Sequence, residues 1–182
     1  MYSERTEPRD NESSADPEIQ LKLGLGLDPD DADEILELAT NCQCFSQDKL
    51  TMLEQSVWEE AYNEGEPYCV FITARAVNGD EEPLAGFACF GNIPGEEGCL
   101  ELYLVAVDEE FREIGIGSAL LDEVSRQAAA AESGTIFCEV PENKAHEAAR
   151  SFFESQGYLR QTRHYRFFIP EKGNAVFAKA IS

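Results

Sequence analysis

The chain has 182 residues and a mass of 20.2 kDa, which suits one α/β domain with a short appendage. It carries 14 Lys and Arg against 36 Asp and Glu, so the formal net charge is −22 and the pI is about 4.2. This charge excludes non-specific binding to nucleic acid and to anionic membranes, because both require an excess of cations. No run of 18 apolar residues and no apolar signal segment is present, so the sequence predicts a cytoplasmic protein.

The cysteines argue against a metal site. Cys69, Cys89 and Cys99 lie in apolar runs, where a thiol behaves as a small hydrophobe. Only Cys42 and Cys44 are close in sequence, and C-x-C without a second pair or a nearby His is a poor zinc signature. We therefore expect reduced thiols and no metal.

The first half of the chain begins with a polar segment. Residues 1–16 are rich in Ser, Glu, Asp and Pro without apolar periodicity, which predicts a disordered acidic tail ahead of one domain over 17–182. Apolar residues alternate over 18–27, which is the period of a strand. Asp28 then suits the start of a helix, and a second helix is expected over 46–64.

The second half alternates strands and helices. Asn78-Gly79-Asp80 is a strong hairpin signal, and the nearly continuous apolar run CLELYLVAV predicts a central strand covered on both faces. Helices are expected to begin near Ile116 and to span 145–155, and the strands are expected at 68–77, 84–90, 99–107, 135–140, 158–169 and 175–181. This order, βααβββαβαββ, has no internal repeat and indicates one domain.

The sharpest local feature is the junction at residues 105–121. A buried strand runs into a turn that contains Arg112, Gly115 and Gly117, and an amphipathic helix begins there. Glycines let backbone N–H groups approach a ligand, and a helix N-terminus adds unpaired donors and a partial positive charge. The turn therefore predicts a phosphate cradle. The alternative is a tight turn whose glycines serve packing alone.

These residues resemble a known family. Arg112-Glu-Ile-Gly115-Ile-Gly117 matches the R/Q-x-x-G-x-G/A signature of the GNAT superfamily of N-acetyltransferases, and residues 149–158 match its A-x-x-F-Y-x-x-x-G-F/Y segment. Glu139, Arg150 and Phe152 are similar to a bacterial branch whose substrate is undefined. The resemblance, over about 18–182, implies an α/β fold of the α+β type: a mixed, mostly antiparallel sheet of six to seven strands, flanked by about four helices.

The resemblance also implies acetyl-CoA as co-substrate. Backbone groups of one strand would pair with the pantetheine arm, the amides of the glycine turn would hold the pyrophosphate with Arg112 as the nearest cation, and His146 and Phe153 would touch the arm. The cofactor-binding residues expected on this ground are Val105, Ala106, Val107, Arg112, Glu113, Ile114, Gly115, Ile116, Gly117, Ser118, His146 and Phe153.

Glu101 is the candidate general base. It lies in CLELYLVAV, on the face predicted to hold Tyr103 and Val105, and burial of its carboxylate would raise its pKa toward neutrality. By the resemblance it falls where the histone acetyltransferase branch carries its catalytic Glu. The alternative is a Glu at a sheet edge, solvated or bridged to an Arg.

Three positions depart from the family pattern. The Tyr proposed to protonate the departing thiolate is Phe153, a second aromatic hydroxyl is replaced by Phe168, and Glu113 stands where Gly is frequent. Tyr165 is the candidate substitute acid, with Tyr158 or water as alternatives.

The resemblance implies that the protein transfers acetyl directly from acetyl-CoA to a primary amine of a small molecule or peptide. The rivals are a non-catalytic acyl-CoA-binding or sensing domain, and a structural homologue that binds no cofactor. Arg160, Arg163 and Arg166 would balance acidic neighbours, line the substrate entrance or contact the adenosine 3′-phosphate. Because many members of the family dimerise, a homodimer is one expectation.

Overall fold

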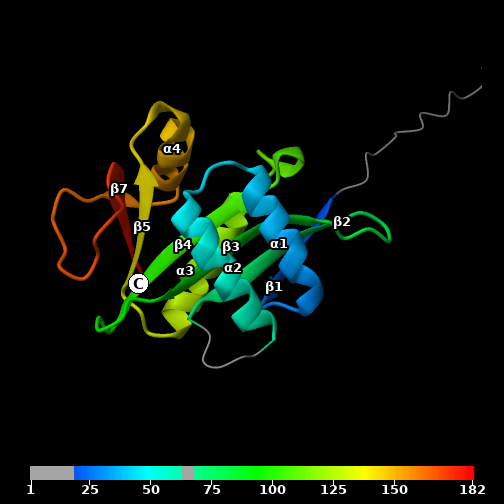
Figure 1. Cartoon of the computed structure of the whole chain (residues 1–182), viewed down its shortest axis with the longest axis horizontal. Helices are drawn as coiled ribbons and strands as arrows, with labels where there is room; N and C mark the ends of the chain where they lie inside the picture. The colour runs from blue at the N-terminus through cyan, green and yellow to red at the C-terminus, as the bar shows by residue number, and fades with distance from the viewer. Residues whose placement is uncertain (1–18, 63–67) are drawn as a thin grey trace, which may run out of the picture.

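A computed structural model describes residues 19–62 and 68–182 (Figure 1). The acidic tail predicted over 1–16 lies outside the described residues. One seven-stranded sheet dominates, in the order β1-β2-β3-β4-β5-β7-β6, and every neighbouring pair is antiparallel except β4 and β5. The strands are β1 Gln20–Leu25, β2 Val70–Val77, β3 Leu84–Asn92, β4 Cys99–Val107, β5 Thr135–Pro141, β6 Leu159–Arg160 and β7 Asn174–Ala180.

Four helices cover the sheet. Helices α1 (Pro29–Asn41) and α2 (Gln47–Ala61) pack on one face, and α3 (Ile116–Ala130) crosses the other (Figure 1). Helix α4 (Glu147–Ser155) follows β5 and adds Phe153 to the core on the α3 side. This mixed, mostly antiparallel sheet with four helices confirms the fold class predicted from the sequence.

Local signals determine where α1 and α2 begin. Asp28 precedes α1, and its backbone N–H donates to Asp31 at 2.9 Å. Ser46 precedes α2, and its hydroxyl accepts from the backbone N–H of Lys49 at 3.3 Å. Both arrangements satisfy N–H groups that a helix start leaves without partners. The start of α2 is therefore well defined, and it places Lys49 over the sheet.

A β-bulge in β4 exchanges the faces of that strand. Cys89 of β3 lies opposite Leu104 and Phe90 lies opposite Leu102, so Tyr103 is the extra residue of β4. Before the bulge Leu102 packs in the core on the α3 face, and after it Leu104 packs in the core under α1 and α2. The prediction that Glu101 shares a face with Val105 is therefore wrong, because Val105 packs against the α3-side core.

The strand predicted over 158–169 is also wrong for most of its length. Only Leu159–Arg160 pairs with β7, and Gln161 makes one further backbone bond, to Val176. Beyond it the aromatic side chains of Tyr165, Phe167 and Phe168 gather around Phe137 instead of alternating across a sheet, with ring centroids 5.0, 5.5 and 5.6 Å from that of Phe137.

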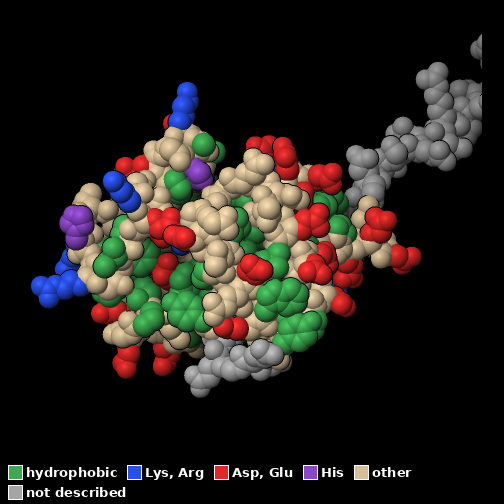
Figure 2. Space-filling view, viewed as in Figure 1, with side chains coloured by type: hydrophobic (Ala, Val, Ile, Leu, Met, Phe, Trp, Pro, Cys, Tyr) green, Lys and Arg blue, Asp and Glu red, His purple; other side chains and the backbone are tan. Residues whose placement is uncertain are grey.

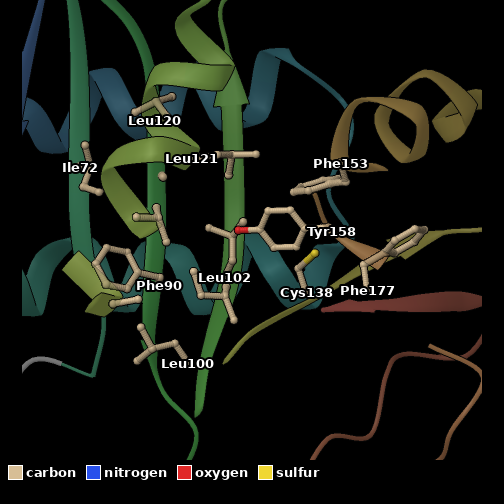
Figure 3. Close-up of a cluster of buried hydrophobic side chains, with 14 of the residues drawn as sticks. Ile72, Phe90, Leu100, Leu102, Leu120, Leu121, Cys138, Phe153, Tyr158 and Phe177 are labelled. Atoms are coloured by element: carbon tan, nitrogen blue, oxygen red, sulfur yellow. The ribbon is translucent and has the colours of Figure 1, made fainter. Parts of the chain in front are cut away.

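The core on the α3 face joins the sheet to α4. Phe177 of β7 is fully buried in the same cluster as Phe153 and Tyr158, whose ring centroids lie 5.3 Å apart (Figure 3). Replacement of Phe177 by Ala is expected to lower the free energy of unfolding by about 3–5 kcal/mol, because apolar contacts are lost and a cavity remains. Urea denaturation measures this loss. The control is Leu159→Ala on the adjacent strand, where the side chain is 68% exposed and a change within about 0.5 kcal/mol is expected. Equal losses in the two variants would contradict this view of the core.

Candidate active site

The centre of the sheet is split. The parallel strands β4 and β5 pair only where Cys99–Glu101 lies beside Thr135–Phe137, although both strands continue beyond that point. From Leu102 to Val107 no strand pairs with this edge of β4 in the described part of the chain. Backbone N–H and C=O groups on a free strand edge are available to a ligand that extends along it.

The split opens into a cavity of about 120 Å³. Its walls come from the diverging strands, from the α1–α2 turn with the start of α2, from α4 and from the turn before β7. Lining residues include Val105 of the predicted cofactor set on β4, and His146 and Phe153 from the opposite wall. Three residues expected to hold a cofactor arm, far apart in the sequence, are thus brought together. Ala106 and Val107 continue the same free edge of β4.

The glycine turn stands at the end of that edge. Gly115 has φ +91° and Glu113 has φ +63°, so the turn passes through the left-handed region twice. The first intrahelical bond of α3 runs from the N–H of Ala119 to Gly115, which leaves the N–H groups of Ile116, Gly117 and Ser118 without intrahelical partners. These N–H groups form the donor set expected of an anion cradle.

Glycine stands at positions 115 and 117 for different reasons. The positive φ of Gly115 favours glycine, and a Cβ there would meet nothing within 4 Å. A Cβ on Gly117 would lie 2.9 Å from Cζ of Phe152, so Gly117 lets the aromatic ring of α4 approach α3. Packing therefore accounts for Gly117, and the left-handed backbone accounts for Gly115; the phosphate cradle stays a prediction.

Charged side chains at the turn are exposed. The Nε–H of Arg112 donates to the carbonyl of Val107 at 3.5 Å, which holds the base of this side chain near the end of β4. The side chain of Glu113 is exposed, as is that of Ile114. Because the Glu113 carboxylate remains in water, its charge is well screened, and its cost to a nearby anion is small.

His146 closes one side of the cavity. Its Nδ1 lies 2.7 Å from the side-chain oxygen of Asn143, and its Nε2 lies 3.1 Å from the backbone carbonyl of Cys44. The ring therefore bridges the start of α4 and the turn between α1 and α2. Substitution here would loosen the cavity wall as well as remove a contact.

Glu101 is held in a buried charge network. Its side chain is 20% exposed, and its Oε1 lies 3.9 Å from Nζ of Lys49. Burial raises the pKa of Glu101; with Lys49 opposing the shift and Glu139 adding to it, the pKa rises from 4.5 to about 7. A carboxylate with this pKa exchanges protons readily near neutrality. Glu101 does not itself line the cavity; Leu102 and Lys49 do.

Lys49 and Glu139 are the site residues that the sequence analysis missed. The Glu139 side chain is 7% exposed and lies 3.1 Å from Nζ of Lys49. Its Oε2 accepts from the backbone N–H of Glu171 at 2.6 Å and from Asn174 at 3.1 Å. The signal was present: Glu139 is a lone acid in an apolar strand, which is the argument that selected Glu101.

The candidate acid is placed elsewhere. The hydroxyl of Tyr165 donates to Gln161 at 2.8 Å, and its ring packs edge-on against Phe137. It lines a separate hollow rather than the cavity beside Lys49. The structure therefore does not bring Tyr165 and Glu101 together, because the segment that carries Tyr165 folds around Phe137. Phe168 lies in the same aromatic cluster, and Tyr158 is fully buried in the core.

Comparisons with known proteins agree with this architecture. The model of the acetyltransferase (GNAT) family matches residues 32–158, so the chain belongs to that family. No curated protein matches the sequence. Among solved structures, one from Desulfovibrio desulfuricans described as a GNAT-family acetyltransferase has a TM-score of 0.76 at 21% identity, covering 90% of this chain and 100% of that chain.

Two further structures carry more specific names. The ribosomal-protein-S18-alanine N-acetyltransferase of Escherichia coli has a TM-score of 0.64 at 21% identity, covering 90% of this chain and 95% of that chain. NAA60 of Arabidopsis thaliana, solved in complex with acetyl-CoA, has a TM-score of 0.66 at 16% identity, covering 89% and 99%. The family and enzyme class expected from the sequence, an acyltransferase, are thereby confirmed.

Residues 19–62 and 68–182 contain neither a membrane-spanning helix nor a metal-binding group. None of their helices has both the length and the apolar character needed to cross a bilayer. They contain no group of three His, Cys, Asp or Glu side chains arranged to hold a metal ion.

The raised pKa of Glu101 makes the stability of the protein depend on pH. The folded state holds this proton more tightly than the unfolded state, so the contribution is complete below about pH 4.5 and is lost as pH rises through about 7. Glu101→Gln is expected to gain about 2 kcal/mol of unfolding free energy relative to wild type between pH 5 and pH 8. Urea denaturation at both pH values measures this gain, with exposed Glu97→Gln as the control. An identical pH dependence in Glu101→Gln and wild type would show that Glu101 titrates normally.

Proposed function

We propose that the protein is an acetyl-CoA-dependent N-acetyltransferase that transfers acetyl directly to a primary amine of a small molecule or peptide. The observation that carries the proposal is the split between β4 and β5. It leaves a free edge of β4 that begins beside the buried carboxylate of Glu101, passes the cavity at Leu102–Val105 and ends before the turn that leads to the unpaired donors of α3.

The residues present fit acetyl-CoA. The free edge of β4 from Leu102 to Val107 offers backbone groups to the amides of the pantetheine arm, as another strand would. The N–H groups at the start of α3 suit the pyrophosphate, and Arg112 supplies a cation in a chain whose net charge repels anions. Phe153 and His146 enclose the arm from the opposite wall. When bound, acetyl-CoA supplies the acyl group as an activated thioester.

Glu101 acts as general base through water. The acceptor enters as an ammonium and must lose a proton before its nitrogen can attack the thioester carbonyl. Because Glu101 does not itself line the cavity, the proton reaches the carboxylate through a water molecule rather than by direct contact. A backbone N–H on the free edge of β4 stabilises the oxyanion. No side-chain nucleophile is needed.

The leaving group needs no acid from the protein. Phe153 cannot donate a proton, and Tyr165 lies in a different hollow. A thiol has a pKa near 8.5, so coenzyme A departs as thiolate and takes a proton from water at a modest cost in rate.

A second candidate is an acyl-CoA-binding domain without turnover. Phe153 and Phe168 favour it, because both replace hydroxyls that the family pattern leads one to expect, and neither of the substitutes considered, Tyr165 or Tyr158, lines the cavity. The two candidates differ in one observable: only the enzyme acetylates an amine.

Glu101→Gln separates the two functions. We expect kcat with a reactive amine to fall about 10²–10³-fold, because the general base is lost, while the Kd for acetyl-CoA stays within about twofold. The wild-type kcat/KM should rise with pH through about 7, as Glu101 ionises, and this limb should vanish in the variant. Stopped assays of coenzyme A release measure kcat and kcat/KM, and calorimetric titration measures the Kd for acetyl-CoA. Glu97→Gln is the control. Unchanged kcat in Glu101→Gln would remove Glu101 from the mechanism.

Arg112→Ala tests the cradle. Loss of one charge-assisted contact to phosphate should weaken acetyl-CoA binding about tenfold in calorimetric titration. Arg126→Ala is the matched control, because Arg126 lies at the opposite end of α3 on the surface, paired with Glu123. Equal affinities for wild type and Arg112→Ala would assign the cradle to backbone groups alone. No binding by the wild-type protein would overturn the proposed function.

A further inference from the structure

Positive charge is concentrated at one end of this acidic chain. Residues 160–182 contain five Lys and Arg and one acid, a net charge of +4, while the other 159 residues carry −26. Most of the blue side chains visible in Figure 2 lie on the left and at the top, over the elements that follow β5, and the right side is mainly red. This end of the chain is therefore the region where the local charge favours an anion, although the net charge of the whole chain repels one.

Two of these cations, Arg160 and Arg163, line a hollow beside β6 and the start of β7. This hollow, of about 160 Å³, is named here the arginine hollow; Thr162 and His164 supply further donors to it, and Tyr165 and Phe168 supply aromatic walls. One carboxylate, Glu142, also lines it and is paired with Arg160. Such a lining suits a carboxylate or a phosphate group, which accepts several hydrogen bonds at once.

Arg163 is positioned but not neutralised. Its guanidinium carbon lies 5.8 Å from the ring centroid of Tyr165, whose hydroxyl is in turn held by Gln161. Arg160 forms an ion pair with Glu142, but no carboxylate of residues 19–62 or 68–182 lies within ion-pair distance of Arg163. Balancing acidic neighbours, the first of the alternatives left open by the sequence, therefore explains Arg160 and not Arg163.

The arginine hollow adjoins the cavity of the candidate active site. Asn174 lines both, and its side chain donates to Glu139 of the buried charge network. Pro170 lines the hollow, and the next residue, Glu171, lines the cavity. A molecule with its amine in the cavity therefore has its next few atoms within reach of the hollow.

We propose that the arginine hollow binds an anionic group of the acceptor, so that the preferred substrate is a primary amine that also carries a carboxylate or a phosphate. This inference rests on the proposed function for the identity of the acceptor, but the binding of an anion does not require turnover. The two sites divide the recognition: carboxylates in the cavity attract the ammonium end, and Arg163 attracts the acidic end.

The test compares peptides that differ only in charge. The first probe is fluorescein-labelled Ala-Glu-Asp-Glu-Gly-Lys. The second has Gln-Asn-Gln in place of Glu-Asp-Glu, and the third has phosphoserine in place of the Asp at its third position. Each peptide has a free α-amine and carries the dye on the terminal lysine. Fluorescence anisotropy is measured with the full chain saturated with coenzyme A. We expect the acidic and phosphorylated peptides to bind at least tenfold more tightly than the neutral one, and added salt to reduce the difference. Phosphoethanolamine and glutamate as competitors distinguish a small-molecule anion from a peptide side chain.

Arg163→Gln and Arg166→Gln form the matched pair of variants. Both remove one guanidinium from the same loop, but Arg163 lines the arginine hollow and Arg166 does not. We expect Arg163→Gln to weaken binding of the acidic peptide about tenfold and Arg166→Gln to weaken it less than twofold. In turnover assays the loss should fall on the KM for the acidic acceptor, with the KM for acetyl-CoA unchanged.

Equal effects of the two variants would show a general attraction to positive charge and overturn the proposal. Equal binding of acidic and neutral peptides by the wild-type chain would overturn it as well. Failure of the proposed function gives a different pattern: charge-selective binding that Arg163→Gln weakens, with no acetylation of any peptide.

Discussion

The structure depends on one constraint, the divergence of β4 from β5. Two parallel strands at the centre of a sheet normally satisfy each other's backbone groups along their length, and here they do so only over Cys99–Glu101. The bulge at Tyr103 twists β4 away just beyond that point, and the edge from Leu102 onward is left without a strand partner among the described residues. Backbone groups without a strand partner at the middle of a domain are costly, which supports the proposal that a ligand completes the sheet here.

The same divergence explains the buried charges. Lys49, Glu101 and Glu139 come from α2, β4 and β5 and meet where the two strands separate. Removing charges from water is unfavourable, and such a network contributes little net stability even when its partners are well placed. In the proposed reaction its value lies in proton transfer, because burial holds the pKa of Glu101 near neutrality while Lys49 offsets part of the repulsion between the two carboxylates.

Features that depend on neighbouring residues were predictable from the sequence. The glycine turn is one, because the positive φ of Gly115 and the start of α3 are local properties. The apolar run of β4 is another, since its length and composition alone indicate a central strand. The motif at Arg112–Gly117 then led to the family, and the family model confirms it.

Features that depend on tertiary contacts were not predictable. Lys49 and Glu139 are 90 residues apart, and only the folded chain brings their side chains within 3.1 Å. The bulge at Tyr103 shifts Val105 to the opposite face, which strict alternation along the run could not reveal. The segment that carries Tyr165 was expected to be a strand because its aromatic residues resemble a strand pattern, while in the structure they pack around Phe137. The network and the arginine hollow therefore emerged only from the structure.

Amide hydrogen exchange by NMR, with and without acetyl-CoA, tests whether the cofactor binds along the free edge of β4. We expect acetyl-CoA to slow exchange at those amides between Leu102 and Val107 that have no partner on β3, together with the amides of Ile116–Ser118. Their neighbours on β4 that already bond to β3 should change little. Protection at the start of α3 without any change along β4 would contradict the claim that the free edge of β4 is the binding surface.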